Sequence, residues 1–543
     1  MEIIRTENLT FTYPQNNIPT LKNVSLSINS GDFITVFGAT GSGKSTFLKM
    51  LKKEISPLGK REGKIFFENI EIENLSSEKS SFSVGYVMQR PEHQIVTDKV
   101  WHELAFGLEN LNIPVEVMGR RIAEMASFFG IEDWFDKSVH VLSGGQKQML
   151  NLASVMVMNP KVIILDEPTS QLDPISAQDF ISTLNKINKE LGITVIIAEH
   201  RLEELITISD KLLIFNEGEV LFFEEPKTVV SKINNTSLMS YMPIPARYFG
   251  IVDGKGTFPL NIREGRDYVE KRFSEIEYKV DKNNKTQIKS EIALEFKDVY
   301  FKYDRKQKDI LSDISFSVYK NEIFCILGGN GSGKSTTLSV ASGIEKSYYG
   351  KVKIFDKIIK EYKNNELYNK VSVLPQDVQT VFTEDTVEKE LKDFDSIPFF
   401  FSNYDNKKNQ HPYDLSGGEQ QLLAFSKIIK KQSDILLLDE PTKGLDPIKK
   451  EELVLIIKQL KQKGKTIIIV THDLEFAAEC SDRCALLFKG KIMSVENSKD
   501  FFCGNSFYTT SVNKMTRGIL NNIVTLDDLI KADRAFFEQK GDI

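Results

Sequence analysis

The chain has 543 residues, which is too many for one ordinary domain and fits two to four. It is 41% hydrophobic and 27% charged, with a formal net charge of −6, so its composition offers no basic surplus for a nucleic-acid partner. The sequence has no apolar run near the ~18 residues of a membrane span and no apolar leader, so we expect an intracellular protein that reaches a membrane only through a partner.

The first informative element is the apolar run FITVFG at residues 33–38, which predicts a buried parallel strand. GATGSGKST at residues 38–46 follows it and opens a helix, which is the setting in which this glycine-rich pattern holds phosphate. We predict that Lys44 reaches the β and γ phosphates of ATP and that Ser45 binds Mg²⁺. The predicted ATP-binding residues of this loop are Gly38, Gly41, Gly43, Lys44, Ser45 and Thr46.

Two acids end the next informative strand, VIILDE, at residues 162–167. Asp166 places a carboxylate where the coordination shell of Mg²⁺ needs one, and Glu167 is positioned to orient or deprotonate the attacking water. The alternative is a pair of surface acids at a strand end. The recurrence of the same pattern later in the chain argues against that alternative.

Each of these motifs occurs twice. The offset is 273 residues from Asp166 to Asp439 and 272 from His200 to His472, which indicates tandem homologous domains. The second copy supplies Gly328, Gly331, Gly333, Lys334, Ser335, Thr336, Asp439, Glu440 and His472. We therefore predict an α/β protein with two tandem P-loop NTPase domains, each carrying a helical insertion.

The expected boundaries are a first domain at 1–230, a linker with local structure at 231–291, a second domain at 292–495 and a C-terminal tail at 496–543. The linker holds turn-forming, helix-forming and lysine-rich pieces but no phosphate motif. Cys480 and Cys484 lie one helical turn apart, and buried thiols explain them better than a metal pair.

LSGGQ at 142–146 and LSGGE at 415–419, together with the DEPT motifs and the strand-end histidines, resemble the nucleotide-binding subunits of ABC transporters. A serine-glycine-glycine turn at a helix start is a second anion cradle with no phosphate of its own. The resemblance implies that two domains pair head to tail around two ATP molecules. Ser143, Gly144 and Gly145 would then close the site of Lys334, and Ser416, Gly417 and Gly418 that of Lys44.

The same resemblance assigns further roles. His200 and His472 would contact the γ-phosphate, and Gln89 and Gln376, at the ends of VGYVMQ and VSVLPQ, would touch Mg²⁺ or the attacking water. Tyr13 and Tyr303 would stack on adenine, for which an aromatic face suffices. Because both copies keep these residues, we predict that both sites hydrolyse ATP.

The segment PEHQIVTDKVWHELAFGLENLNIP at 91–114 resembles the corresponding segment of energy-coupling factor (ECF) importer ATPases. We expect Asp98 to cap a helix, Trp101 to share one face with its apolar residues, and Glu103 and Glu390 to contact a basic coupling helix. The alternative for these side chains is a helix packed on its own domain. The second insertion is 14 residues shorter, which suits an asymmetric membrane partner.

The resemblance implies a peripheral ATPase at the cytoplasmic face of the cell membrane, with ATP and Mg²⁺ as cofactors. It would power the uptake of a vitamin or micronutrient with a transmembrane T-like coupling protein and a substrate-binding membrane S component. No nucleic acid is expected as a partner, and the two domains would pair within one chain. The alternatives are the fused ATPase of a conventional importer and a non-transport protein that acts on ribosomes or DNA.

Overall fold

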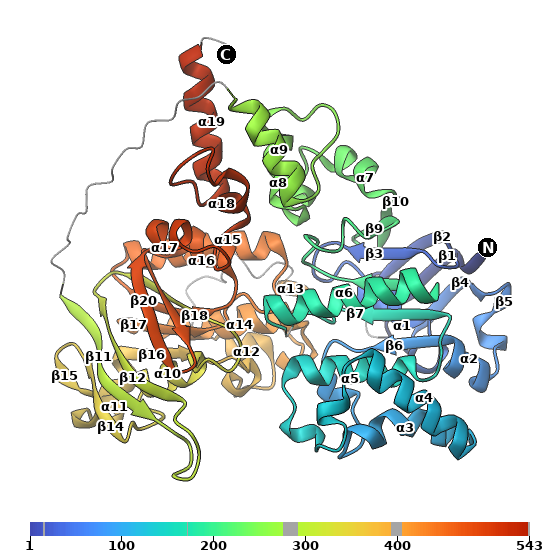
Figure 1. Ribbon diagram of the computed structural model, residues 1–543, viewed down its shortest axis with the longest axis horizontal. Helices are drawn as coiled ribbons and strands as arrows, with labels where there is room; N and C mark the ends of the chain where they lie inside the picture. The colour runs from blue at the N-terminus through green and yellow to red at the C-terminus, as the bar shows by residue number, and fades with distance from the viewer. Residues whose placement is uncertain (15–16, 171, 275–290, 393–403, 541–543) are drawn as a thin grey trace. The chain divides into compact units, whose positions relative to one another are not determined.

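The computed structural model describes residues 1–14, 17–170, 172–274, 291–392 and 404–540, which form two compact units. The first unit comprises Met1–Pro243 with Gly254–Asn261, and the second comprises Ile244–Asp253 with Ile262–Ile543. Each unit carries a four-stranded antiparallel sheet and a six-stranded, mostly parallel sheet (Figure 1). The predicted α/β class with two tandem P-loop copies is confirmed.

In the first unit the six-stranded sheet carries the predicted motifs. Its order is β10-β9-β3-β8-β7-β6, and only β10 runs antiparallel to its neighbour. Strands β3, β7 and β8 are buried along their whole length, as expected for apolar parallel strands with both faces covered. The strands of this sheet are β3 Phe33–Phe37, β6 Val84–Val87, β7 Val162–Asp166, β8 Thr194–Ala198, β9 Lys211–Asn216 and β10 Glu219–Glu224.

The four-stranded sheet of this unit has the order β2-β1-β4-β5. Its strands are β1 Glu2–Thr12, β2 Leu21–Asn29, β4 Lys60–Phe67 and β5 Ile70–Glu71. The helices of the unit are α1 Lys44–Met50, α2 Ser77–Ser83, α3 Val100–Asn110, α4 Val115–Phe128, α5 Gly144–Met156, α6 Pro174–Leu191 and α7 Pro226–Ile233. Helices α3, α4 and α5 lie together in Figure 1 around a core that includes Leu104, Trp134 and Leu150. Helices α3 and α4 lie in the predicted helical insertion, and α5 follows it directly.

The second unit repeats this plan, with sheets ordered β12-β11-β14-β15 and β16-β17-β18-β13-β19-β20. The strands are β11 Ile292–Phe301, β12 Leu311–Tyr319, β13 Ile323–Leu327, β14 Tyr349–Ile354, β15 Lys357–Ile358, β16 Val371–Leu374, β17 Ile435–Asp439, β18 Thr466–Thr471, β19 Arg483–Phe488 and β20 Lys491–Asn497. The helices that follow β13 are α10 Lys334–Ala341, α11 Asn364–Lys370, α12 Val387–Glu390, α13 Tyr404–Lys407, α14 Gly417–Lys430, α15 Pro447–Gln462, α16 Leu474–Cys480 and α17 Ser498–Gly504.

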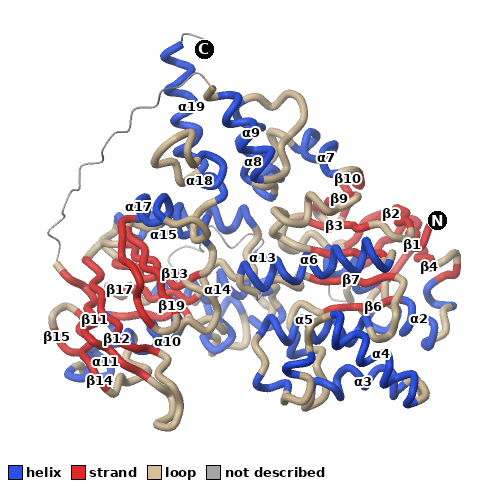
Figure 2. The backbone as a smooth tube through the Cα atoms, in the orientation of Figure 1, coloured by secondary structure: helices blue, strands red, loops and turns tan. Residues whose placement is uncertain are grey.

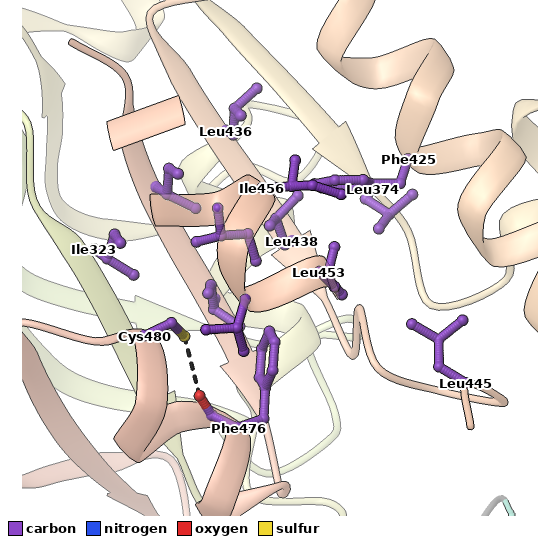
Figure 3. Close-up of a cluster of buried hydrophobic side chains, with 14 of the residues drawn as sticks. Ile323, Leu374, Phe425, Leu436, Leu438, Leu445, Leu453, Ile456, Phe476 and Cys480 are labelled. Carbon is purple, nitrogen blue, oxygen red and sulfur yellow. Dashed lines mark hydrogen bonds between the residues drawn. The ribbon is translucent and has the colours of Figure 1, made fainter. Parts of the chain in front are cut away.

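Apolar side chains from the sheet and from its helices fill the core of the second unit (Figure 3). Leu438 of β17 and Leu453 of α15 both belong to this cluster. Cys480 joins it, and its thiol donates to the carbonyl oxygen of Phe476 at 3.1 Å. Cys480 and Cys484 are both buried, and burial raises the pKa of the Cys484 thiol to about 12. These thiols therefore behave as packing groups.

A small helical cluster lies beside the second sheet system, where α8 Ile244–Val252 and α9 Ile262–Arg272 pack against α18 Ser511–Thr516 and α19 Leu526–Lys540 (Figure 2). Its apolar core includes Tyr248, Val269 and Leu529. The residues that form α8 and α9 come from the predicted linker, and those of α18 and α19 come from the predicted tail. The two segments, about 240 residues apart in the sequence, share one core.

Candidate functional site

The first glycine-rich loop connects β3 to α1. Gly43, at the start of α1, has a φ of 103°, and a Cβ there would lie 2.8 Å from the carbonyl oxygen of Thr20, so glycine is required. The buried Lys44 turns back over the loop, where its Nζ donates to the carbonyl oxygens of Gly38 at 2.8 Å and Ala39 at 3.1 Å. The ammonium group is therefore held at the mouth of the loop.

The second loop, between β13 and α10, has the same geometry. The Nζ of Lys334 donates to the carbonyl oxygens of Gly328 at 2.9 Å and Gly329 at 3.1 Å. The hydroxyls of Ser42 and Ser332, one in each loop, are buried and have no hydrogen-bond partner among the described residues. A buried hydroxyl without a partner is costly, and phosphate oxygens in the loop would accept from it. The loops therefore fit the phosphates of a nucleotide.

Asp166, at the end of β7, lies against the first loop. The Oγ of Ser45 donates to its Oδ1 at 2.8 Å. The next residue, Glu167, accepts from the Nε2 of Gln89 at 2.7 Å, and its other oxygen lies 2.9 Å from the Nε2 of His200. The structure thus brings together all five residues predicted for catalysis and metal binding in the first copy.

In the second copy the glutamate has different partners. Glu440 lies 2.9 Å from the Nδ1 of His472 and accepts from the Oγ1 of Thr471 at 3.0 Å. Gln376 is exposed, and within the described part of the chain no hydrogen bond joins it to Glu440. The two copies therefore share the glutamate–histidine pair and differ in the placement of the glutamine.

Both glutamates also have positive φ angles, 46° for Glu167 and 48° for Glu440. Such a conformation is unfavourable for a non-glycine residue and persists where the surroundings enforce it. Burial opposes ionisation of these carboxyls, but the neighbouring histidines outweigh it and lower the pKa of both Glu167 and Glu440. The glutamates are therefore carboxylates at neutral pH, as a general base requires.

The aspartates directly before these glutamates, Asp166 and Asp439, have raised pKa values. Burial, reinforced by the neighbouring glutamate, raises the pKa of Asp166, and burial raises that of Asp439 to about 6. The Oδ1 atom of Asp439 is buried without a hydrogen-bond partner among the described residues. An acid that loses solvent and lacks a donor is stabilised by a cation, and its oxygen together with a serine hydroxyl suits Mg²⁺. The residues present therefore fit the predicted metal.

Tyr13 and Tyr303 occupy equivalent places. Each hydroxyl lies 3.2 Å from a threonine Oγ1 at the start of the loop helix, Thr46 in the first copy and Thr336 in the second. Tyr303 is 57% exposed, so the residue is accessible to a ligand. Stacking on adenine stays a prediction that this placement permits.

Ser143 and Ser416 are the N-cap residues of α5 and α14. Each forms a capping box, with Gln146 in the first copy and Glu419 in the second. Both serines are exposed, and a Cβ on Gly144 or Gly417 would meet nothing within 4 Å. Gly145 packs against Ser176 and Gly418 against Gly444, which anchors each turn on its own unit. Closure of each site by the serine turn of the other copy stays a prediction.

The expectations for the segment after Gln89 need correction. Asp98 does not cap α3, because Lys99 occupies the N-cap position and no side chain caps the helix. Trp101 is 38% exposed and does not lie on the buried face formed by Val100, Leu104, Ala105 and Leu108. The residue at which a helix starts determines which of its side chains face the core, and α3 starts so that Trp101 faces outward.

The prediction that Glu103 and Glu390 contact a basic coupling helix is also wrong, because both residues are buried within their own unit. Glu103 accepts from the backbone N–H groups of Val96 at 3.1 Å and Thr97 at 2.9 Å. Glu390 accepts in the same way from Thr383 at 2.6 Å and Glu384 at 2.7 Å. Each glutamate braces the loop that precedes its helix.

Tyr86 was not among the predicted site residues, yet its hydroxyl donates to the Oδ2 of Asp166 at 3.3 Å. The signal was a hydroxyl-bearing residue inside the otherwise apolar strand β6. Thr471, which donates to Glu440, was not among the predicted site residues either. In that case the signal was a polar residue at the end of a strand, directly before the predicted histidine.

A family described as "ABC transporter" matches residues 21–170 and 311–443. An ABC transporter ATP-binding protein of Bacillus thuringiensis subsp. konkukian is 40% identical over 97% of both chains. One from Clostridium tetani is 35% identical over 78% of this chain and 97% of its own.

Two solved structures are similar to this chain. One is cbiO1 of Clostridium perfringens, part of the ABC transporter complex cbiONQ, which is 32% identical over 44% of this chain and 97% of its own, with a TM-score of 0.39. The other is the archaeal ribosome recycling factor aABCE1, in complex with the stalk protein aP1. It is 19% identical over 92% of this chain and 91% of its own, with a TM-score of 0.57, and shows a shared fold.

Proposed function

The chain belongs to the ABC transporter family as an ATP-binding subunit with two ATPase cassettes, and from this we propose that it powers micronutrient uptake through an ECF-type importer. Its membrane partners would be a transmembrane T-like coupling protein and a substrate-binding S component. The described residues include no helix that is both long and apolar enough to cross a bilayer. We place the protein at the cytoplasmic face of the membrane, bound through these partners.

The residues of each site have separable tasks in the hydrolysis of ATP. The lysine at the mouth of the loop, Lys44 or Lys334, pairs with the phosphates. Bound Mg²⁺, held by the serine and aspartate of the site, would neutralise charge on the phosphate oxygens. The ionised glutamate, Glu167 or Glu440, accepts a proton from the attacking water.

One observation carries the proposal of a membrane partner: apolar side chains are exposed around α3 of the first unit. Val96 is 62% exposed, Trp101 38%, Phe106 40% and Val115 77%. Four large apolar side chains exposed within about 20 residues support an interaction site in this segment. It lies in the segment whose sequence resembles that of ECF ATPases. A helix that docks here would bury apolar surface, as amphipathic helices do in a groove.

Hydrogen bonds join the loop that precedes α3 to the end of β6 and to α5. Gln94 accepts from the backbone N–H of Met88 at 2.9 Å and donates to the carbonyl oxygen of Tyr86 at 3.0 Å. The Nζ of Lys147 donates to Glu92 at 3.2 Å, which joins the loop to α5, the helix capped by Ser143. Movement at Gln89 would therefore shift both the docking surface and the serine turn.

The two cassettes are part of one chain, so we propose that they pair with each other around two ATP molecules. A covalent tether gives the second cassette a high effective concentration at the first. ATP would close this pair and hydrolysis would reopen it, which supplies the motion passed to the membrane partner.

The proposal is tested by purifying the tagged chain from native membranes and identifying its partners. We expect a T-like membrane protein and a small S component. Replacing Trp101 and Phe106 with alanine should release these partners while ATP binding is retained. Leu191→Ala removes an exposed apolar side chain at the end of α6 and serves as the control. Recovery of only ribosomal proteins, or of a permease dimer with a separate binding protein, would contradict the proposal.

A further inference from the structure

The strand before the catalytic glutamine differs between the two copies at one position next to the metal-binding aspartate. Tyr86 of β6 lies opposite Ile164 of β7, and Val373 of β16 lies opposite Leu437 of β17. Ile164 and Leu437 each lie two residues before the aspartate that ends the strand. The register therefore makes Val373 the counterpart of Tyr86.

The difference changes the hydrogen bonding of the aspartate. In the first unit both carboxylate oxygens have a donor, Ser45 at 2.8 Å on Oδ1 and Tyr86 at 3.3 Å on Oδ2. Tyr86 is buried, and its hydroxyl donates to the Oδ2 of Asp166. In the second unit valine has no hydroxyl, and the Oδ1 of Asp439 has no partner among the described residues.

We propose that Tyr86 is a positioning residue that orients Asp166 for a divalent cation at the first ATP site, and that the second site binds the cation more weakly. This inference rests on the Mg²⁺ sites of the proposed function and is independent of the transport role. A carboxylate held by two donors has lost its rotational freedom before the cation arrives. Each oxygen retains a further lone pair for the metal.

The expected loss of cation affinity can be estimated from other groups that orient metal ligands. Loss of such a partner costs about 10- to 100-fold in metal affinity. The Tyr86–Asp166 contact is long for an O–H···O hydrogen bond, so the lower end of this range applies. We expect Tyr86→Phe to weaken cation binding at the first site about tenfold.

If the role of Tyr86 is purely structural, Tyr86→Phe should have a different effect. A buried tyrosine hydroxyl needs an acceptor, and Asp166 could simply be the nearest one. In that case Tyr86→Phe would lower the stability of the fold and leave cation affinity unchanged. The two roles are separated by measuring cation affinity and stability on the same variants.

The experiment uses the full chain and Mn²⁺, whose binding is followed by electron paramagnetic resonance with a non-hydrolysable ATP analogue. Lys334→Ala disables the second loop, so the signal reports the first site. In this background Tyr86→Phe should raise the Mn²⁺ dissociation constant about tenfold, with little change in the unfolding temperature of the metal-free, nucleotide-free chain. A Lys334→Ala chain that binds no Mn²⁺ would overturn the metal site and the inference with it.

A reciprocal pair at the second site is the matched control. In a Lys44→Ala background, Val373→Tyr adds a ring and a hydroxyl, whereas Val373→Phe adds the ring alone. Tighter Mn²⁺ binding by the tyrosine variant than by the phenylalanine variant is expected. The inference is overturned if this pair binds Mn²⁺ equally, or if Tyr86→Phe stays within twofold of its parent. If Tyr86→Phe fails to fold, the Val373 pair alone decides.

Discussion

The helical cluster of α8, α9, α18 and α19 depends on one buried carboxylate, and its removal makes a quantitative prediction. Asp533 accepts from the hydroxyl of Tyr248 at 2.8 Å and from the Nη2 of Arg272 at 2.9 Å, and the Nε of Arg272 donates to it as well. The side chains of Asp533 and Arg272 are 6% and 20% exposed. A charge-assisted pair with this little solvent differs from a surface ion pair.

Asp533→Asn keeps the shape of the side chain but removes its charge. Breaking a buried pair costs about 3–5 kcal/mol, and a hydrogen bond to a charged group is worth about 1.5–3 kcal/mol. Because Arg272 keeps some contact with water and asparagine still accepts one hydrogen bond, we expect a loss of about 2 kcal/mol. The site of the loss should be local, with faster amide exchange in α9 and α19 before the rest of the second unit is affected.

A surface ion pair of α9, the helix that contains Arg272, provides the control. Arg266 lies 3.5 Å from Glu270, one turn away, and their side chains are 38% and 54% exposed. Such a surface pair is worth about 0.3–0.5 kcal/mol, so Arg266→Ala should change amide exchange in α9 very little. The prediction is refuted if amide exchange in α9 and α19 is as slow in the Asp533→Asn variant as in the Arg266→Ala variant. Equal exchange would mean that the predicted linker and tail are not held together by this pair.

Further predictions concern the ATP sites and the brace of α3. Glu167→Gln and Glu440→Gln should each reduce steady-state ATP hydrolysis substantially, because each removes a general base; unchanged turnover in either variant would contradict two active sites. Asp439 has a pKa raised to about 6, so its favourable contribution to the stability of the metal-free protein is present below pH 4 and is lost as the pH rises through 6. Asp439→Asn should therefore be the more stable chain at pH 7.5 without metal, by about 3 kcal/mol in denaturant unfolding, and the advantage should disappear at pH 4. Glu103→Gln should cost about 1–2 kcal/mol by weakening two backbone hydrogen bonds, with faster amide exchange at Val96 and Thr97 as the readout.

The phosphate loops could be predicted from the sequence because their chemistry is local. The glycines and Lys44 lie within one short stretch, and the same stretch returns intact in the second copy. Glu167 and His200 were each predicted for the site, although their contact was not; they meet because adjacent parallel strands bring their carboxyl ends together. In both cases the end of a parallel strand and the loop that follows it determine where the predicted side chains lie.

Other features depend on distant parts of the chain and could not be predicted. Glu103 and a surface acid look the same in the sequence, and only the path of residues 96–97 turns its carboxylate inward. The helix of the predicted linker has a polar sequence, IREGRDYVEKRF, whose apolar side finds its partners about 240 residues later. Gln376 follows its strand in the same way as Gln89, yet the loops beyond them diverge and the two side chains lie differently.

The burial of Glu103 and Glu390 changes what a membrane partner must look like. If these acids faced outward, recognition would rest on charge and would weaken with salt. Instead each carboxylate is used within its own unit, and the large apolar side chains exposed on α3 are Trp101 and Phe106. In the second copy α12 is only four residues long, and Lys427 of α14 donates to Glu390 at 2.6 Å. The docking energy at the first copy would therefore come from apolar burial, and the glutamates would act by keeping the loop rigid enough to transmit the state of the ATP site.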